Sequence, residues 1–185
     1  YQWTFLWSDG TIGRKKVVTS SGSYYLTVTG PNGCVNSSPV FIVTVHPQPV
    51  PVIKPEGPTS FCAGGRVILD ADQAGAFTSY LWSNGARTRK ITVTQTGSYS
   101  VTVANSQGCL GTAPAVPVQV NPIPVPVITT SSGNLTFCEG GSVTLEAPVG
   151  YSSYLWSNGA NTRTTTVDQA GIYTVTVVSN TGCQG

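Results

Sequence analysis

Charged residues are scarce in this sequence, since only 9% of its 185 residues are Asp, Glu, Lys or Arg, against about 25% in a typical soluble domain. The formal net charge is +2, so there is no broad basic surface for nucleic acid or an anionic membrane. His46 is the only histidine, and methionine is absent. No apolar run approaches the roughly 18 residues of a transmembrane helix, so we expect no membrane span.

Patterns of catalytic and metal-binding residues are also missing. The sequence has no Gly-x-Ser-x-Gly, and no acidic pair stands near its single histidine. No two cysteines have the spacing of zinc ligands, and the seven Asp and Glu residues are scattered, which disfavours a calcium cluster. We therefore expect no catalytic residues, no cofactor, no metal and no enzymatic activity.

What the sequence does contain is one short stretch that occurs three times. An aromatic residue, Leu and Trp run into Ser, Asn or Asp, and Gly, with the tryptophans at Trp7, Trp82 and Trp156. Each copy predicts a strand that ends in a tight turn, because β-forming residues precede Asn-Gly or Asp-Gly. The spacing of 75 and then 74 residues is that of small independent domains rather than of short solenoid repeats.

The best-preserved copy predicts an all-β fold. At least six short segments with alternating polar and apolar residues are separated by turn signals, and none has helical periodicity. The segments are 52–54, 66–71, 80–82, 90–94, 99–103 and 116–120. Alternation with one polar face indicates two antiparallel sheets packed face to face. We predict tandem immunoglobulin-like β-sandwich modules of about 75 residues.

The repeats also predict the module boundaries. Residues 1–46 form a partial module that lacks its first strands, 47–121 a complete module, and 122–185 a module that lacks its last strand. Prolines at 47, 49 and 51 fix the backbone between the first two modules, so we expect a stiff spacer and a rod. The open edges of a partial module invite other strands, and we expect a polymeric or array context.

Four of the five cysteines recur in pairs. Cys62 and Cys109 stand in one copy, and Cys138 and Cys183 hold the same places in the next. We predict the disulfides Cys62–Cys109 and Cys138–Cys183, each tying two loops at one end of a sandwich, in an oxidising compartment. Cys34 matches Cys109, and its partner would lie before residue 1, so it is left unpaired by truncation.

Other recurring side chains suggest structural roles. We place six in the core: Trp7, Trp82, Trp156, Tyr24, Tyr99 and Tyr173. We expect the hydroxyls of Tyr99 and Tyr173 to bond the backbone upstream. Opposite the tryptophans, an outward leucine recurs at Leu6, Leu81 and Leu155, which either lies under a loop or makes lateral contacts between arrays.

Charged residues recur as well. Three arginines, Arg14, Arg89 and Arg163, either cover an aromatic ring or end in solvent. Asp70 and Glu146 have outward parity and could pair with a neighbouring strand, to little effect if exposed.

Together the motifs resemble a known family. The motifs Phe-Cys-x-Gly-Gly, Tyr-Leu-Trp-Ser-Asn-Gly, Gly-x-Tyr-x-Val-Thr-Val, Gly-Cys and Asn-Pro-x-Pro are similar to the bacterial immunoglobulin-like (PKD-like) tandem repeats of large secreted surface proteins. That family includes gliding-motility adhesins and multidomain proteins exported by the type IX route. The resemblance implies adhesins, surface filaments or spacer modules, at the cell surface or outside the cell.

We consider two functions. The first is a structural or adhesive array that acts as a stiff stalk, whose partners are neighbouring modules and other copies of the chain in a filament. The second is a set of carbohydrate-binding or spacer modules attached to a secreted hydrolase, with surface glycans as partners. Trp3 and Tyr25 are the aromatic residues available for stacking on sugars, and neither recurs in the other copies.

Overall fold

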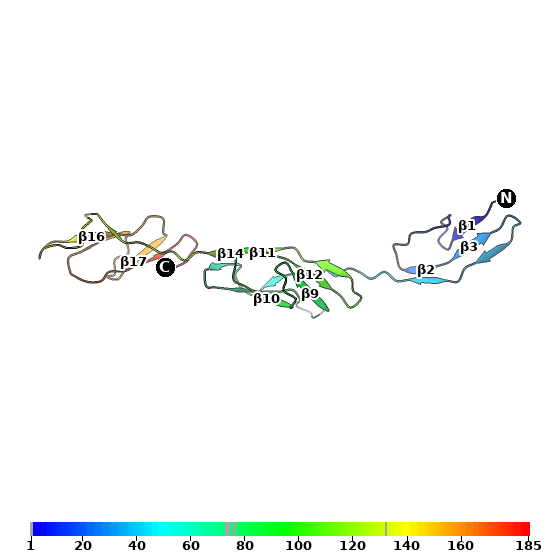
Figure 1. Ribbon diagram of the computed structural model, residues 1–185, viewed down its shortest axis with the longest axis horizontal. Helices are drawn as coiled ribbons and strands as arrows, with labels where there is room; N and C mark the ends of the chain where they lie inside the picture. Colours follow the sequence, from blue (N-terminus) through cyan, green and yellow to red (C-terminus); the bar gives the residue numbers. More distant parts are fainter. Residues whose placement is uncertain (1, 73–74, 76, 132) are drawn as a thin grey trace.

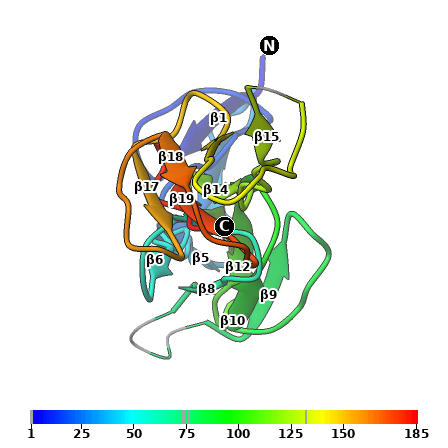
Figure 2. The same cartoon turned by 90° about the vertical axis from the view of Figure 1, so that its left-hand side faces the viewer.

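The chain forms an elongated rod of β-strands. The computed structural model describes residues 2–72, 75, 77–131 and 133–185, and none of these residues lies in a helix. Three groups of strands follow one another end to end, with the N-terminus at one tip and the C-terminus near the junction of the last two groups (Figure 1). Seen along the long axis, the groups largely cover one another (Figure 2).

The middle group is the most complete. Its strands are β6 (Lys54–Pro55), β7 (Ser60–Cys62), β8 (Val67–Asp70), β9 (Ser79–Trp82), β10 (Lys90–Val93), β11 (Gly97–Tyr99), β12 (Val101–Ala104), β13 (Leu110–Thr112) and β14 (Val116–Asn121). They form three short sheets in the orders β10-β8-β6, β13-β12-β9 and β11-β14-β7. All pairs are antiparallel except β14 with β7, which run parallel.

Alternation along these strands builds the core of the middle group. Successive residues of a strand face opposite sides of its sheet. On β10, Ile91 and Val93 are therefore buried, while the residues between and before them are exposed. Trp82 is 2% exposed, and its indole N–H donates to the carbonyl of Thr88 at 2.8 Å. This single polar group of the side chain is thus satisfied without opening the core.

The last group repeats this plan with fewer strands. They are β15 (Thr129–Thr130), β16 (Val143–Glu146), β17 (Ser153–Trp156), β18 (Thr164–Val167) and β19 (Val175–Val178). Sheets β15-β16-β18 and β17-β19 enclose a second buried cluster around Trp156, Leu145 and Val167. Trp82 and Trp156, which hold equivalent positions in the repeat, thus each fill a separate core.

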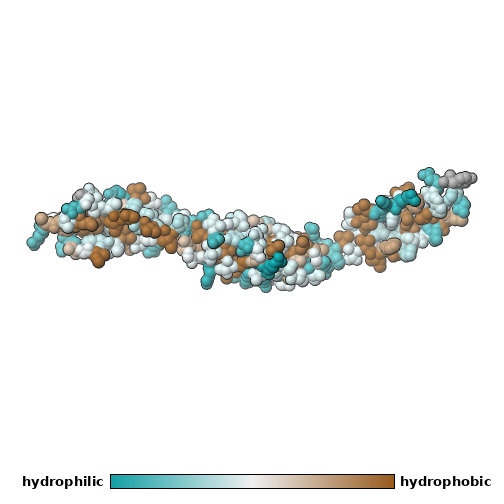
Figure 3. All heavy atoms as spheres, viewed as in Figure 1, coloured by the Kyte–Doolittle hydropathy of each residue, from teal (hydrophilic) through white to brown (hydrophobic). Residues whose placement is uncertain are grey.

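The first group is the least buried. It contains β1 (Thr4–Trp7), β2 (Gly22–Tyr24), β3 (Leu26–Thr29), β4 (Val35–Ser37) and β5 (Phe41–Val43), in the sheets β1-β3-β4 and β2-β5. Trp7 is only half-buried, and Phe41 is 63% exposed. Hydrophobic residues accordingly appear over much of this group's surface at the right of Figure 3.

In the middle and last groups, the sheets thus present an apolar face to a core and a more polar face to solvent. The strand pairs are almost all antiparallel, and the parallel β7–β14 pair closes one side of the middle sandwich. This arrangement confirms the predicted all-β, immunoglobulin-like sandwich fold. The predicted module boundaries remain a prediction, although every strand pair lies within residues 1–46, 47–121 or 122–185.

Candidate functional site at the module joints

The three groups of strands are called the first, middle and last modules from here on. Strand direction places the two cysteines of the middle module, Cys62 and Cys109, at opposite ends of that module. β14 leads the chain out of the module, and β7 runs parallel to it, with Cys62 opposite Asn121. Cys62 therefore lies at the leaving end. The turn that contains Cys109 follows β12, which runs antiparallel to β13, and the Cys109 thiol lies 3.8 Å from the carbonyl oxygen of His46. Cys109 is thus at the entering end of the same module.

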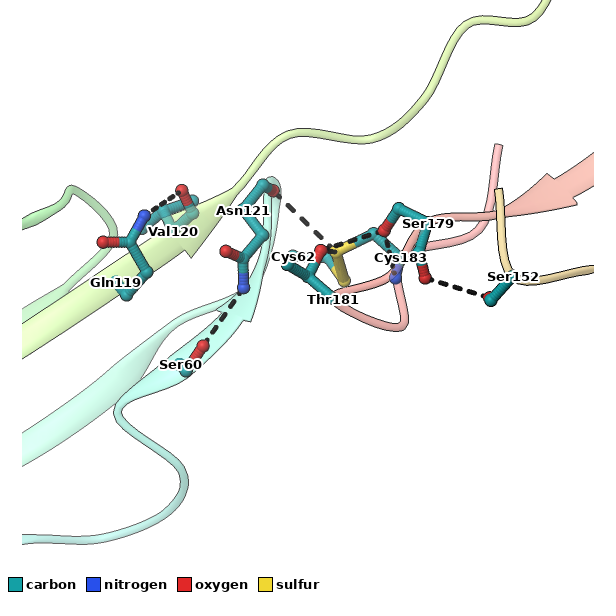
Figure 4. The surroundings of a disulfide bond; sticks show 9 residues. All are labelled: Ser60, Cys62, Gln119, Val120, Asn121, Ser152, Ser179, Thr181 and Cys183. Carbon is teal, nitrogen blue, oxygen red and sulfur yellow. Dashed lines mark hydrogen bonds between the residues drawn. A yellow bond between two sulfur atoms is a disulfide. The ribbon is translucent and has the colours of Figure 1, made fainter. Parts of the chain in front are cut away.

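The disulfide of the structure joins two modules rather than two loops of one. Cys62 is bonded to Cys183 of the last module, 121 residues further along the chain (Figure 4). The predicted pairs Cys62–Cys109 and Cys138–Cys183 are therefore wrong, because the cysteines of one module lie at its two ends. Cys34, Cys109 and Cys138 are free thiols, and Cys34 and Cys138 are exposed.

The bonded joint is also held by close packing on the linker. Asn121 donates from its side-chain amide to the Ser60 hydroxyl at 3.1 Å, which fixes the last residue of β14 beside β7 (Figure 4). Cys183 is fully buried, and its sulfur lies 3.9 Å from the Asn121 carbonyl oxygen. A Cβ on Gly185 would lie 1.8 Å from the carbonyl oxygen of Pro124, so only glycine fits there.

The joint between the first and middle modules has the same contacts without the disulfide. Cys109 lies against the carbonyl of His46, as Cys183 lies against that of Asn121. The side-chain amide of Asn105 donates to the Pro47 carbonyl at 3.2 Å. A Cβ on Gly111 would lie 1.9 Å from the Pro49 carbonyl oxygen. In both joints, therefore, a turn of the following module sits directly on the proline-containing linker that precedes it.

Substituting the glycine of the first joint should loosen it. In Gly111→Ala, the Pro49 carbonyl must move by more than about 1 Å before its oxygen reaches an ordinary contact distance from the added methyl group. We expect faster protease cleavage within residues 46–53 and a wider range of angles between the first two modules. Limited proteolysis and small-angle X-ray scattering measure these two effects. Leu110→Ala, at the exposed neighbouring residue, is the control and should leave both unchanged.

Sequence reasoning missed the glycines and the turn contacts of the joints. The available signal was the recurrence of Cys-x-Gly, at Cys109 to Gly111 and again at Cys183 to Gly185. The spacing marks a conserved shape of the turn, but the sequence does not reveal that the linker carbonyl occupies the space that a Cβ would need. That contact depends on how two modules meet.

A partly buried ion pair joins two strands of the middle sandwich, with a buried carboxylate on Asp70 and an exposed side chain on Arg89. The Arg89 guanidinium donates two hydrogen bonds to the Asp70 carboxylate. They run from Nε to Oδ1 and from Nη2 to Oδ2, each at 3.0 Å. Asp70 thus pairs with the neighbouring strand segment, as its outward parity allowed, but it is only 4% exposed because that segment covers it. Residue 70 ends β8, and Arg89, the residue just before β10, covers it. Arg163 pairs with Glu146 in the last module, whereas Arg14 lies 5.3 Å above the ring of Phe5.

The Arg89 pairing predicts acid sensitivity of the middle module. Hydrogen bonds from Arg89, and then from the Asp72 backbone, hold the pKa of Asp70 below its ordinary value of 3.8, although burial opposes this. The unfolded chain therefore binds a proton on this residue more readily than the folded one. The stability that the carboxylate provides is present above about pH 4 and is lost as the pH falls through the lower, folded-state pKa.

We expect the melting temperature of the middle module to fall by several degrees below pH 4. Asp70→Asn should melt lower at neutral pH but lose much of this dependence, since the titrating group is gone. Circular dichroism melts from pH 2 to pH 7 measure both effects, with Glu139→Gln in an exposed turn as the control. An unchanged acid profile in Asp70→Asn would show that other carboxylates cause the sensitivity.

The remaining predicted positions lie as follows. The hydroxyls of the three tyrosines donate to backbone carbonyls four residues upstream, at Ser20, Gln95 and Gln169, at 3.1, 3.1 and 2.9 Å. All three side chains are half-buried, and those of Tyr99 and Tyr173 pack against the two cores. The three outward leucines, Leu6, Leu81 and Leu155, are 46%, 45% and 56% exposed. At these positions the described residues leave an apolar side chain open to solvent on each module.

The last module also has an open groove beside its core. The groove has a volume of about 340 Å³, and its lining includes Phe137, Leu145 and Tyr173. In the middle module, β14 lies between the equivalents of these flanking segments, β7 and β11. The groove is therefore the place where a strand like β14 fits.

Within the described ranges, no three His, Cys, Asp or Glu side chains are grouped closely enough to hold a metal ion. A search of the same residues for a helix long and apolar enough to cross a membrane finds none.

No family model matches the sequence, and no curated protein matches it. Similar solved structures include the eight N-terminal immunoglobulin domains of Down syndrome cell adhesion molecule, isoform 1.30.30, at 14% identity over 95% of this chain and 35% of that one, with a TM-score of 0.47. The fibronectin(III)-like modules of CbhA from Clostridium thermocellum match at 14% identity over 71% and 88%, with a TM-score of 0.37. Murine CEACAM1b matches at 13% identity over 71% and 92%, with a TM-score of 0.36.

The names of the first two structures describe immunoglobulin domains and fibronectin(III)-like modules. At such identities a likeness says nothing about what this chain binds. The sandwich fold stands on the chain's own strand order and pairing.

Proposed function

We propose that the chain is a stretch of a stiff extracellular stalk, in which tandem sandwich modules hold a fixed direction and carry a structural or adhesive role. The observation that carries this proposal is the Cys62–Cys183 disulfide, which crosses a joint between modules. A bond inside one module would stabilise that module alone. A bond across a joint restricts how two modules turn against each other, which is what a stalk requires.

The linkers support the same role. Prolines at positions 47, 49 and 51 recur at 122, 124 and 126, and proline fixes φ and favours an extended backbone. Each linker is in addition covered by the following module, at Gly111 of β13 in one joint and at Gly185 in the other. Bending at a joint would have to break these contacts as well as rotate the linker.

An extracellular location is part of the proposal. Disulfides persist in oxidising compartments, and the low charge and abundant Thr and Ser suit an exposed β-structure. We place the stalk at the surface of a bacterium, in the class of adhesins and filaments that the repeat motifs resemble. The recurring exposed leucines are our candidates for lateral contact between stalks.

Scattering from the whole chain tests the stalk. Oxidised protein should give the pair-distance distribution of a rod, with a small spread of angles between the middle and last modules. Reduction should widen that spread while each module stays folded by circular dichroism. A compact or freely jointed oxidised chain would contradict the proposal, and so would an angular spread that does not respond to reduction.

Carbohydrate binding is the less favoured alternative. Trp3 is 58% exposed and Tyr25 40%, so both rings are accessible for stacking on sugars. The equivalent positions of the middle copy hold Thr78 and Ser100, however, so the array does not repeat this feature. A glycan array probed with the whole chain decides between the two. Binding that is lost in Trp3→Ala combined with Tyr25→Ala would favour the alternative.

A further inference from the structure

Cys109 occupies the same place in the first joint as the bonded Cys183 occupies in the second. Each sulfur lies within 4 Å of a carbonyl oxygen in the preceding linker, at 3.8 Å for His46 and 3.9 Å for Asn121. The turns that hold the two cysteines match as well. The Asn105 side chain accepts from the Cys109 N–H at 2.9 Å, and the Ser179 hydroxyl accepts from the Cys183 N–H at 3.0 Å.

The strand edge beside Cys109 is open where the second joint has β7. In the middle module, the backbone N–H of Gln119 donates to the Thr59 carbonyl at 2.7 Å, and the Ala63 N–H donates to the Asn121 carbonyl at 2.8 Å. These two bonds seat the strand that carries Cys62. Thr44 and His46 are the residues 75 positions earlier, and among the described residues no strand pairs with that edge.

Burial shows the same difference. Val118 is 2% exposed under β7, but Val43, its counterpart on β5, is only half-buried. Val116 is half-buried, and its counterpart Phe41 is 63% exposed. The first joint thus combines an uncovered apolar edge, two unpaired ladder positions and a thiol at the place where the second joint has a disulfide.

We propose that this joint is a half-site for covalent strand addition, which binds a β-strand of the type Ser-Phe-Cys from another repeat of this kind and bonds its cysteine to Cys109. The strand pairs in parallel with residues 44–46, as β7 pairs with β14. In each module, the cysteine of the Phe-Cys strand then bonds the following module, and the cysteine of the turn bonds the preceding module. One disulfide crosses every joint, and the array is stapled along its whole length.

The bond forms by thiol–disulfide exchange. The Cys109 thiolate attacks the strand cysteine, held as a mixed disulfide with a small thiol such as glutathione, and the small thiolate leaves. One sulfur–sulfur bond forms as one breaks, so no further oxidant is consumed. The biological role of this bond rests on the proposed stalk function. The formation of the bond depends only on the structure of the joint.

A peptide with the sequence of residues 57–65 tests the half-site, added to the full oxidised chain as its glutathione mixed disulfide. For each thiol, the rate of labelling by the peptide mixed disulfide is divided by the rate of labelling by oxidised glutathione alone. This ratio removes differences in intrinsic reactivity among the thiols. Mass-spectrometric mapping then compares the three free cysteines. We expect a preference of about tenfold or more for Cys109, since a seated strand raises the local concentration of its cysteine.

Cys34 is the matched control. It has the same Gly-Cys turn and is more exposed than Cys109, but among the described residues no linker carbonyl or strand edge lies against its thiol. Thr44→Pro removes the N–H that matches the Gln119 donor and should abolish the preference, whereas Thr44→Ala should keep it. Equal labelling of the three thiols, faster labelling of the exposed Cys34 and Cys138, or a preference that survives Thr44→Pro would each overturn the inference.

The outcome is separable from that of the scattering experiment. A rod without selective labelling of Cys109 would leave the stalk standing and reject the half-site. Selective labelling in a freely jointed chain would do the reverse.

Discussion

Replacing Trp82 by alanine should destabilise the middle module by about 3–5 kcal/mol, the usual cost of truncating a large buried aromatic side chain. Trp82 is among the largest fully buried side chains of this module, and it belongs to the core cluster that also includes residues of β8, β10 and β12. The substitution also leaves the Thr88 carbonyl without its indole partner. Small domains have total stabilities of about 5–15 kcal/mol, so the loss is a large share of the whole.

The expected shift in melting temperature is on the order of 15 °C or more, at about 4–8 °C for each kcal/mol in a domain of this size. Hydrogen exchange followed by mass spectrometry assigns the loss to a module, because peptides from residues 66–104 should exchange faster while those from 143–178 do not. Leu81→Ala is the matched control, since it lies on the same strand with its side chain 45% exposed. An equal effect of both substitutions would show that the tryptophan is not the centre of the core.

Breaking the Cys62–Cys183 bond should uncouple the middle and last modules. The bond closes a loop of 121 residues, and chain-entropy reasoning gives at most about 5 kcal/mol of stabilisation for a loop of that size. In Cys183→Ser we expect the two modules to unfold at separate, lower denaturant concentrations. Faster cleavage within residues 122–128 should accompany this change, because the linker loses the cover of the bonded turn.

Peptide mapping without reduction checks the connectivity directly. It should recover a single cross-linked pair, Cys62 with Cys183, and label the other three cysteines as thiols. Cys34→Ser removes an exposed thiol and should leave the unfolding curve unchanged. Recovery of Cys62 with Cys109, or of Cys138 with Cys183, would refute the joint and restore a bond within each module.

The sequence by itself determined the fold class. The period-2 alternation of strands such as 90–94 requires one buried and one exposed face, and the structure buries Ile91 and Val93 as the pattern predicts. The repeated Trp with its Asn-Gly or Asp-Gly signal located the central strand and its turn in all three copies. These features are local, because side-chain alternation and turn chemistry depend on neighbours a few residues away.

The cysteine pairing was decided only by the tertiary structure. Recurrence shows that Cys62 and Cys109 belong to one repeat unit, but repeat membership does not say at which end of a sandwich each one lies. That depends on strand direction, and the parallel β7–β14 pair carries Cys62 to the leaving end while the turn after β12 carries Cys109 to the entering end. Two residues from the same repeat therefore face different neighbours.

The same reasoning explains the burial of Asp70. Parity along a strand predicts which face a side chain points to, and it placed this carboxylate outside. Parity does not predict what covers that face. Arg89 lies just before β10, 19 residues away, and its two hydrogen bonds allow a charged group at the end of β8 to be only 4% exposed. Contacts between distant segments, here an ion pair and at the joints a linker carbonyl against a glycine, arise only once the strands have been packed.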